Sequence, residues 1–185
     1  DHHLLHQVTY DTLLKAERKL GHGAAARWLE ERTQGRGAEF LAMTGEHAER
    51  AGETALAIDC FDTAATEATK RFANAAAISW LRRALVLLGE SEPIRRFDLL
   101  HRLEAICERV GDRSAQDAVH LDMTALLGRH PDDSQLARLM QCRALLSHRR
   151  GDRPASEQHA LRAVELAERS GPAKTACQAH VLLSF

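Results

Sequence analysis

The sequence predicts an all-α fold in which antiparallel helical hairpins stack as a right-handed α-solenoid. Only four prolines and eleven glycines interrupt the 185 residues, and 44% of the side chains are hydrophobic while 4% are aromatic. Apolar residues recur at spacings of three and four, for example along 97–110, and no strand-like alternation is sustained. The segment 111–115, Gly-Asp-Arg-Ser-Ala, returns as Gly-Asp-Arg-Pro-Ala at 151–155, which indicates an internal repeat.

These patterns predict helices at 8–20, 22–33, 38–51, 54–70, 74–88, 95–110, 114–128, 134–150, 155–169 and 173–185. The connections are short, so consecutive helices are expected to pack antiparallel. At the repeated corners, Gly111 and Gly151 suit a left-handed helix end, and Asp112 and Asp152 can cap the next helix. Each pair of helices therefore reads as one helix-turn-helix unit.

Small residues gather on both sides of the corner at Gly52. They resemble the tetratricopeptide repeat, whose two helices carry small residues at their crossing and a large residue that packs between neighbouring repeats. Around the corner at Gly111 the pattern departs, because Glu104, Gln116 and His120 stand where small or large apolar residues are expected. The predicted repeat positions are Leu41, Gly45, Ala48, Gly52, Ala57, Phe61, Ala64, Ala77, Leu81, Ala84, Gly111, Gly151, Ala160 and Ala163.

The N-terminal residues carry a second resemblance. His2, Leu4, Leu5, Val8 and Tyr10, followed by Leu13-Leu14 and Trp28-Leu29, are similar to the stretch after the nucleotide-binding region of large bacterial signal-transduction ATPases of the AAA or NB-ARC type. Some of these carry class III nucleotide cyclase domains and others DNA-binding domains. The resemblance implies that 1–37 is a helical junction after an upstream nucleotide-binding region, and that 38–185 is a truncated repeat array.

Several features support a fragment with no chemistry of its own. The sequence begins without Met, ends in an apolar run, and contains neither G-x-x-x-x-G-K-[ST] nor G-x-G-x-x-G, so ATPase or cyclase activity is expected of other domains. We expect no cofactor. His2 and His6 would share a helix face but are too few ligands to hold a metal, and Cys142 and His148 would not face each other. No catalytic or metal-binding residue is predicted.

Charge and composition bear on the partners. The 25 Lys and Arg nearly balance the 26 Asp and Glu, which makes nucleic acid an improbable partner, and no stretch has the length and apolarity of a membrane span. The four cysteines are far apart and fall in apolar patterns, so they are expected to be reduced core residues of a cytoplasmic protein. Trp28 and Trp80 are also expected in the core.

The function predicted from these observations is that of a protein-interaction or regulatory scaffold. A concave solenoid face would bind a protein, a peptide or a neighbouring domain of the parent chain, with Arg149, Arg150 and Arg153 contacting an acidic partner. The alternative is a small-ligand sensor that relays to an upstream nucleotide-binding or cyclase domain. The helix at 173–185 is expected to expose an apolar face and to cause weak self-association.

Overall fold

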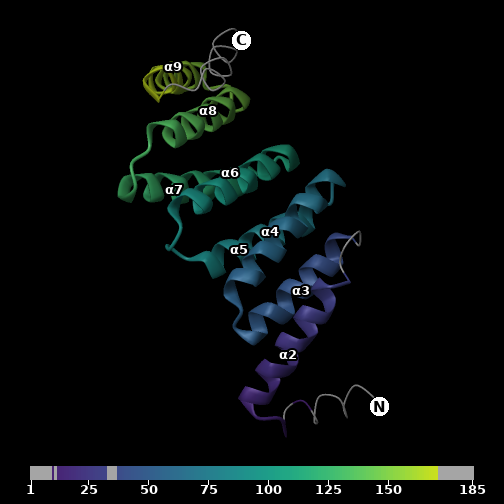
Figure 1. The fold of residues 1–185 in the computed structure, drawn as a ribbon. Coiled ribbons are helices and arrows are strands. Elements are labelled where there is room, and N and C mark those ends of the chain that lie inside the picture. The colour runs from purple at the N-terminus through teal and green to yellow at the C-terminus, as the bar shows by residue number, and fades with distance from the viewer. Residues whose placement is uncertain (1–9, 11, 33–36, 171–185) are drawn as a thin grey trace. The chain divides into compact units, whose positions relative to one another are not determined.

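The computed structural model describes residues 10, 12–32 and 37–170, and within these ranges the chain forms helices and turns with no strand. The helices are α2 (Lys15–Glu30), α3 (Ala38–Ala51), α4 (Thr54–Lys70), α5 (Asn74–Leu88), α6 (Pro93–Val110), α7 (Arg113–Arg129), α8 (Asp133–Arg149) and α9 (Arg153–Ser170) (Figure 1). The predicted all-α fold is confirmed. The chain divides into two compact units, Asp1–Ser91 with α2–α5 and Glu92–Phe185 with α6–α9.

In the first unit each helix packs against the next one along the chain. Ala48, Ala57, Phe61 and Leu81 are completely buried, so the predicted stripe of small and large apolar residues lies in the core. At Gly45 the helices approach closely. A Cβ atom built there would lie 3.1 Å from a ring carbon of Phe61 and 3.2 Å from the Cβ of Cys60.

The N-terminal part of this unit differs from the prediction. A break was expected at Gly21 between helices at 8–20 and 22–33, but α2 continues through Gly21 and ends at Glu30. A single glycine in a helix costs only about 1 kcal/mol relative to alanine. Ala26 and Leu29 are buried on one side of α2, and this burial outweighs the cost of the glycine. Parts of the predicted helix 8–20 and all of 173–185 lie outside the described residues.

The expectation that Trp28 packs in the core is also wrong. The side chain is 54% exposed, while the adjacent Leu29 is 5% exposed. The guanidinium carbon of Arg32 lies 4.4 Å from the centroid of the Trp28 ring. One turn of helix separates Trp28 from Arg32, so the indole is covered by a cation on the outer side of α2 and not by apolar side chains. Trp80 is half-buried.

In the second unit α6, α7, α8 and α9 pack in sequence, and α6 also touches α8. The two corners have the geometry expected from their sequences. Gly111 and Gly151 adopt φ angles of +75° and +78°, and the amide that follows each donates back to the helix, to Cys107 O and Ser147 O, at 3.0 Å. Asp112 and Asp152 then cap α7 and α9 by accepting backbone N–H groups at 3.0 and 3.1 Å.

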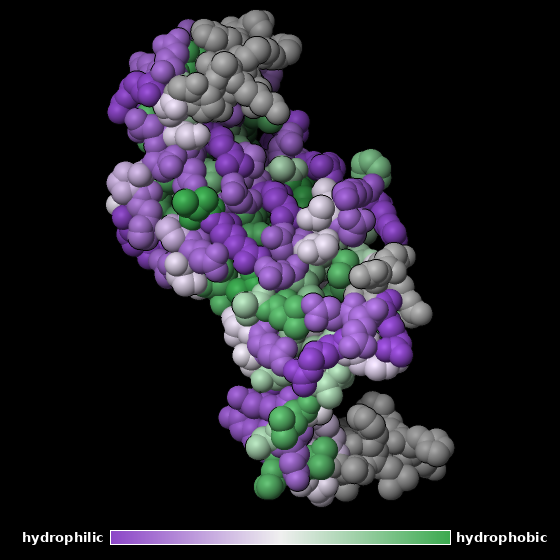
Figure 2. Space-filling model, in the orientation of Figure 1, coloured by the Kyte–Doolittle hydropathy of each residue, from purple (hydrophilic) through white to green (hydrophobic). Residues whose placement is uncertain are grey.

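The visible face of the second unit is mainly hydrophilic, with apolar side chains in separate spots (Figure 2). No helix among the described residues is long and apolar enough to cross a membrane. The predicted boundary after residue 37, between a junction and the repeats, stays a prediction.

Candidate functional site

The hairpins α3–α4, α6–α7 and α8–α9 place different residues at the same three positions. Counted from the helix-ending glycine, these positions hold Gly45, Ala57 and Phe61 in the first hairpin, Glu104, Gln116 and His120 in the second, and Ala144, Ser156 and Ala160 in the third. In the first hairpin the contact is between apolar groups, and in the third the Ser156 hydroxyl donates to the backbone oxygen of Ala144 at 3.0 Å. The second hairpin puts a carboxylate, an amide and an imidazole in this place.

These three side chains form a buried polar cluster together with Cys142 of α8. Gln116 Nε2 donates to Glu104 Oε1 at 2.9 Å, and His120 Nε2 lies 3.4 Å from the same oxygen. Glu104, Gln116 and His120 are only 3–5% exposed. The Cys142 thiol is hydrogen-bonded to Glu104, and one ligand atom from each of Glu104, His120 and Cys142 lies within 4.8 Å of the other two.

The protonation of the cluster follows from these contacts. Burial acts to raise the pKa of Glu104, but the polar contacts with His120 and Gln116, the charge of His120 and the thiol of Cys142 together lower it. The pKa of Cys142 is raised well above its ordinary value, first by burial and then by the charge and hydrogen bond of Glu104. At neutral pH the cluster therefore contains a carboxylate and a neutral thiol.

His120 Nε2 is the exceptional atom of the cluster. It is fully buried, and although it lies 3.4 Å from Glu104 Oε1 it has no hydrogen-bond partner. Buried polar atoms are nearly always hydrogen-bonded, and leaving one without a partner costs about 1–3 kcal/mol. The cluster contains the types of ligand atom found in metal sites, and one of these atoms, His120 Nε2, has no hydrogen-bond partner.

An open groove of about 440 Å³ lies beside the cluster, between α7, α8 and α9. His120 is a member of the cluster and also lines the groove. Arg143 is half-buried in the groove, and its Nη2 donates to the Thr124 hydroxyl at 2.6 Å. Burial lowers the pKa of Arg143, although a guanidinium remains charged at any physiological pH. Within the described residues no carboxylate forms an ion pair with it. His159 also lines the groove, and its pKa is lowered by burial and then by the charge of Arg143.

One of the three predicted arginine contacts, Arg150, lies at this groove. Arg150 lines it and forms an ion pair with Asp117 of α7 at 2.6 Å. Arg149 pairs with Glu108 of α6. All of Arg149, Arg150 and Arg153 are exposed, and exposed ion pairs contribute little to stability, so an acidic partner could compete for these cations. Their role in binding stays a prediction.

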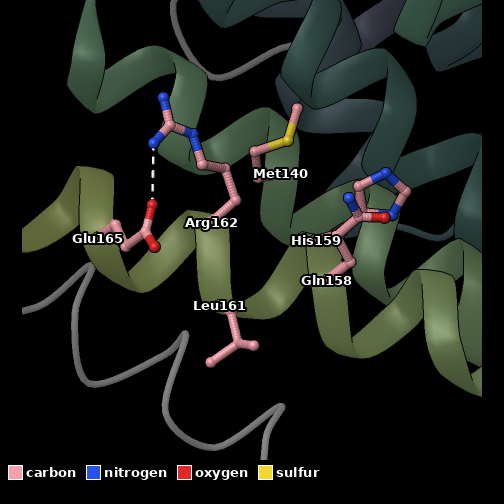
Figure 3. A pocket seen from close by; sticks show the side chains of 6 residues that line it. All are labelled: Met140, Gln158, His159, Leu161, Arg162 and Glu165. Carbon is pink, nitrogen blue, oxygen red and sulfur yellow. Dashed lines mark hydrogen bonds and ion pairs between the residues drawn. The ribbon is translucent and has the colours of Figure 1, made fainter.

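A second groove of about 410 Å³ lies along α8 and α9. It is lined by Met140, Gln158, His159, Leu161, Arg162 and Glu165 (Figure 3). Arg162 and Glu165 form an ion pair at 2.9 Å, and Leu161 points away from that pair. The cation in this groove is thus already balanced by a carboxylate, in contrast to Arg143.

Comparison with known proteins assigns no family to the chain. No family model matches the sequence, and no curated protein matches it. Among solved structures, the chain is similar to one titled "MamA MSR-1 C2", with 18% sequence identity and a TM-score of 0.40 over 90% of this chain and 99% of that chain. A likeness of this size supports no conclusion about function.

The sequence signalled part of this site without identifying it. Glu104, Gln116 and His120 were recognised as departures from the repeat pattern, and the structure brings these three together. The sequence predicts Cys142 as a core residue that does not face His148 of the same helix. Its actual polar neighbour, Glu104, is on α6.

Proposed function

We propose that this segment is a non-catalytic protein-interaction module that binds an acidic stretch of a partner protein in the groove between α7, α8 and α9. The observation that supports it is Arg143. Its guanidinium has lost part of its hydration, and its hydrogen-bond partner is the neutral hydroxyl of Thr124. A carboxylate from a partner would supply the charge-assisted hydrogen bonds that this cation lacks.

The surroundings of Arg143 favour an extended peptide with at least one apolar side chain. Leu121 lies at the groove and is 69% exposed, so it offers apolar contact beside the cation. Arg150, near Asp117, can extend the interaction to a second acidic residue. The partner would be a separate protein or a neighbouring domain of a larger parent, and the N-terminal resemblance favours a signal-transduction ATPase as that parent.

Selection from a random peptide library displayed on phage tests this function. We expect the full chain to enrich acidic peptides and bind them directly in calorimetric titration. Arg143→Gln should weaken binding tenfold or more, which corresponds to about 1.4 kcal/mol. Arg162→Gln is the matched control, because Arg162 is an exposed arginine of α9 that already pairs with Glu165. Enriched peptides that lack acidic residues, or that bind Arg143→Gln as tightly as the unmodified chain, would reject the proposal.

A small-ligand sensor is the second candidate. The groove volume of about 440 Å³ lies in the range of small-molecule sites, roughly 300–1,000 Å³, although such sites are mostly apolar and bury most of the ligand. A set of small carboxylates and phosphates would be tested for an increase in the melting midpoint. A specific increase that is lost in Arg143→Gln, combined with no peptide enrichment, would favour the sensor over the scaffold.

Self-association through 173–185 remains a separate proposal. Sedimentation of the chain beside a variant with charged substitutions at Val181 and Leu182 tests it. We expect weak, concentration-dependent dimers that the substitutions abolish. Equal sedimentation of the two would reject it.

A further inference from the structure

We propose that Glu104, His120 and Cys142 bind a single divalent transition-metal ion, and that the ion they fit best is Zn²⁺. The three ligands come from three different helices, α6, α7 and α8. Their donor atoms already lie within 4.8 Å of one another. Spacing along the chain gave no indication of such a site, because metal-binding motifs are recognised by close pairs of ligands and these residues are widely separated.

The donor atoms have the right chemistry and nearly the right separation. Imidazole nitrogen, thiolate sulfur and carboxylate oxygen are the three ligand types that Zn²⁺ takes in proteins. Tetrahedral coordination at the usual bond lengths puts neighbouring ligand atoms roughly 3.3–3.7 Å apart. His120 Nε2 and Glu104 Oε1 are 3.4 Å apart. Small side-chain rotations would bring the Cys142 sulfur to the same distance.

A metal ion would also resolve what the cluster leaves unsatisfied. It would give His120 Nε2 the partner that this buried nitrogen lacks. Glu104 is a buried carboxylate whose direct contacts are an amide, a thiol and an imidazole, and a cation would compensate its charge. Gln116 Nε2 donates a hydrogen bond to Glu104 Oε1 at 2.9 Å. Metal-binding side chains are commonly oriented by such a hydrogen bond from a residue that does not itself bind the metal.

Binding would displace the thiol proton. A metal ligand must be deprotonated, so the Cys142 thiol loses its proton to solvent as the Cys142–metal bond forms. The filled site would carry no net charge, because two anionic ligands balance the divalent ion. His120 also lines the groove between α7, α8 and α9, so one of the three ligand residues lies at the edge of a solvent-filled space.

The alternative hypothesis is that the cluster is a purely structural polar network that holds α6, α7 and α8 together. The two hypotheses predict different responses to added metal. A structural network has no affinity for a transition metal beyond that of surface histidines, and it leaves Cys142 equally reactive with and without zinc. Cobalt reports the difference directly, because a Co²⁺–thiolate bond produces a charge-transfer absorption that histidine and carboxylate ligands do not produce.

The test is a Co²⁺ titration of the full chain after reduction and chelator treatment, followed by competition with Zn²⁺. We expect one equivalent to give the thiolate absorption and Zn²⁺ to abolish it. Cys142→Ser should lose the absorption, and His120→Gln and Glu104→Gln should weaken binding at least tenfold. Cys60→Ser and Cys177→Ser are the controls and should retain it. Circular dichroism of each metal-free variant establishes that it is folded.

A second measurement needs no substitution. Alkylation of the unmodified chain, mapped by mass spectrometry, should be slowed by Zn²⁺ at Cys142 and unchanged at Cys177. The proposal is overturned if saturating Co²⁺ gives no thiolate absorption, if the absorption persists in Cys142→Ser, or if zinc protects Cys177 in place of Cys142. None of these measurements uses a partner peptide, so the outcome is independent of the interaction function proposed above.

Discussion

Gly45 and Gly21 are both glycines inside helices, yet alanine should stabilise the fold at Gly21 and should not do so at Gly45. Gly21 lies on the exposed side of α2, and a Cβ atom there would meet nothing within 4 Å. A Cβ atom at Gly45 would lie 3.1 Å from the Phe61 ring and 3.2 Å from the Cβ of Cys60. The Cβ of Cys60 is fixed to the backbone of α4, so it can move away only if the helix moves.

The expected magnitudes follow from these contacts. Alanine in place of glycine stabilises a helix by about 1 kcal/mol, and this is the whole effect expected of Gly21→Ala. At Gly45 the same gain is opposed by overpacking, which typically costs about 1–3 kcal/mol. Gly45→Ala should therefore lie about 1–3 kcal/mol below Gly21→Ala in unfolding free energy. Ala57→Leu should cost a similar 1–3 kcal/mol, because Ala57 is completely buried.

Urea denaturation followed by circular dichroism measures the difference. Both alanine variants lose the same backbone freedom in the unfolded chain, so their comparison isolates the contact between α3 and α4. If Gly45→Ala were as stabilising as Gly21→Ala, the helices would not cross closely at Gly45, and the interpretation of this hairpin as a tetratricopeptide-like crossing would be wrong.

Further predictions concern a strained turn, a histidine and the polar cluster. Phe72 has a φ of +60° and is 75% exposed, so Phe72→Gly should raise the melting midpoint by relieving backbone strain of about 1–3 kcal/mol, less the flexibility that glycine adds. The pKa of His22 is lowered from 6.5 by burial and by the charges of His47 and Arg50. Its neutral form therefore stabilises the fold above pH 6.5, and unfolding free energy should fall as pH drops below that value, less steeply in His22→Gln. Replacing Glu104, Gln116 and His120 together by Leu, Met and Phe should leave metal-free stability in urea denaturation unchanged or higher, because apolar side chains of similar volume avoid the cost of burying polar groups.

The sequence predicted the helices best where local chemistry decides the structure. The corners at Gly111 and Gly151 combine a left-handed glycine with a capping aspartate, and both signals act within a few residues. The break expected at Gly21 failed because burial of Ala26 and Leu29 outweighs the weak preference of one glycine. The exposure of Trp28 was missed because an apolar stripe in a sequence does not fix which of its members face outward.

The polar cluster depends on tertiary structure that no local pattern contains. Which side of α8 faces α6 is set by the packing of whole helices, so the contact of Cys142 with Glu104 could not be read from spacing. Glu104, Gln116 and His120 could be flagged, since each breaks an apolar pattern. Their shared location follows once the helix-ending glycines are aligned, because equivalent positions of a repeat occupy equivalent places in each hairpin.

The other two hairpins with this corner give the strongest reason to look for a ligand at this cluster. At the same positions they use Gly45, Ala57 and Phe61, all buried, or Ala144, Ser156 and Ala160, of which Ser156 is half-buried, and neither set contains a charged group. Two of the three hairpins therefore pack these positions with apolar or nearly apolar residues. Burying a carboxylate and an imidazole nitrogen without a hydrogen bond, as the α6–α7 hairpin does, is less favourable for the free energy of folding. Because stability alone favours the apolar residues, the polar set is better explained by something it binds than by the fold it supports.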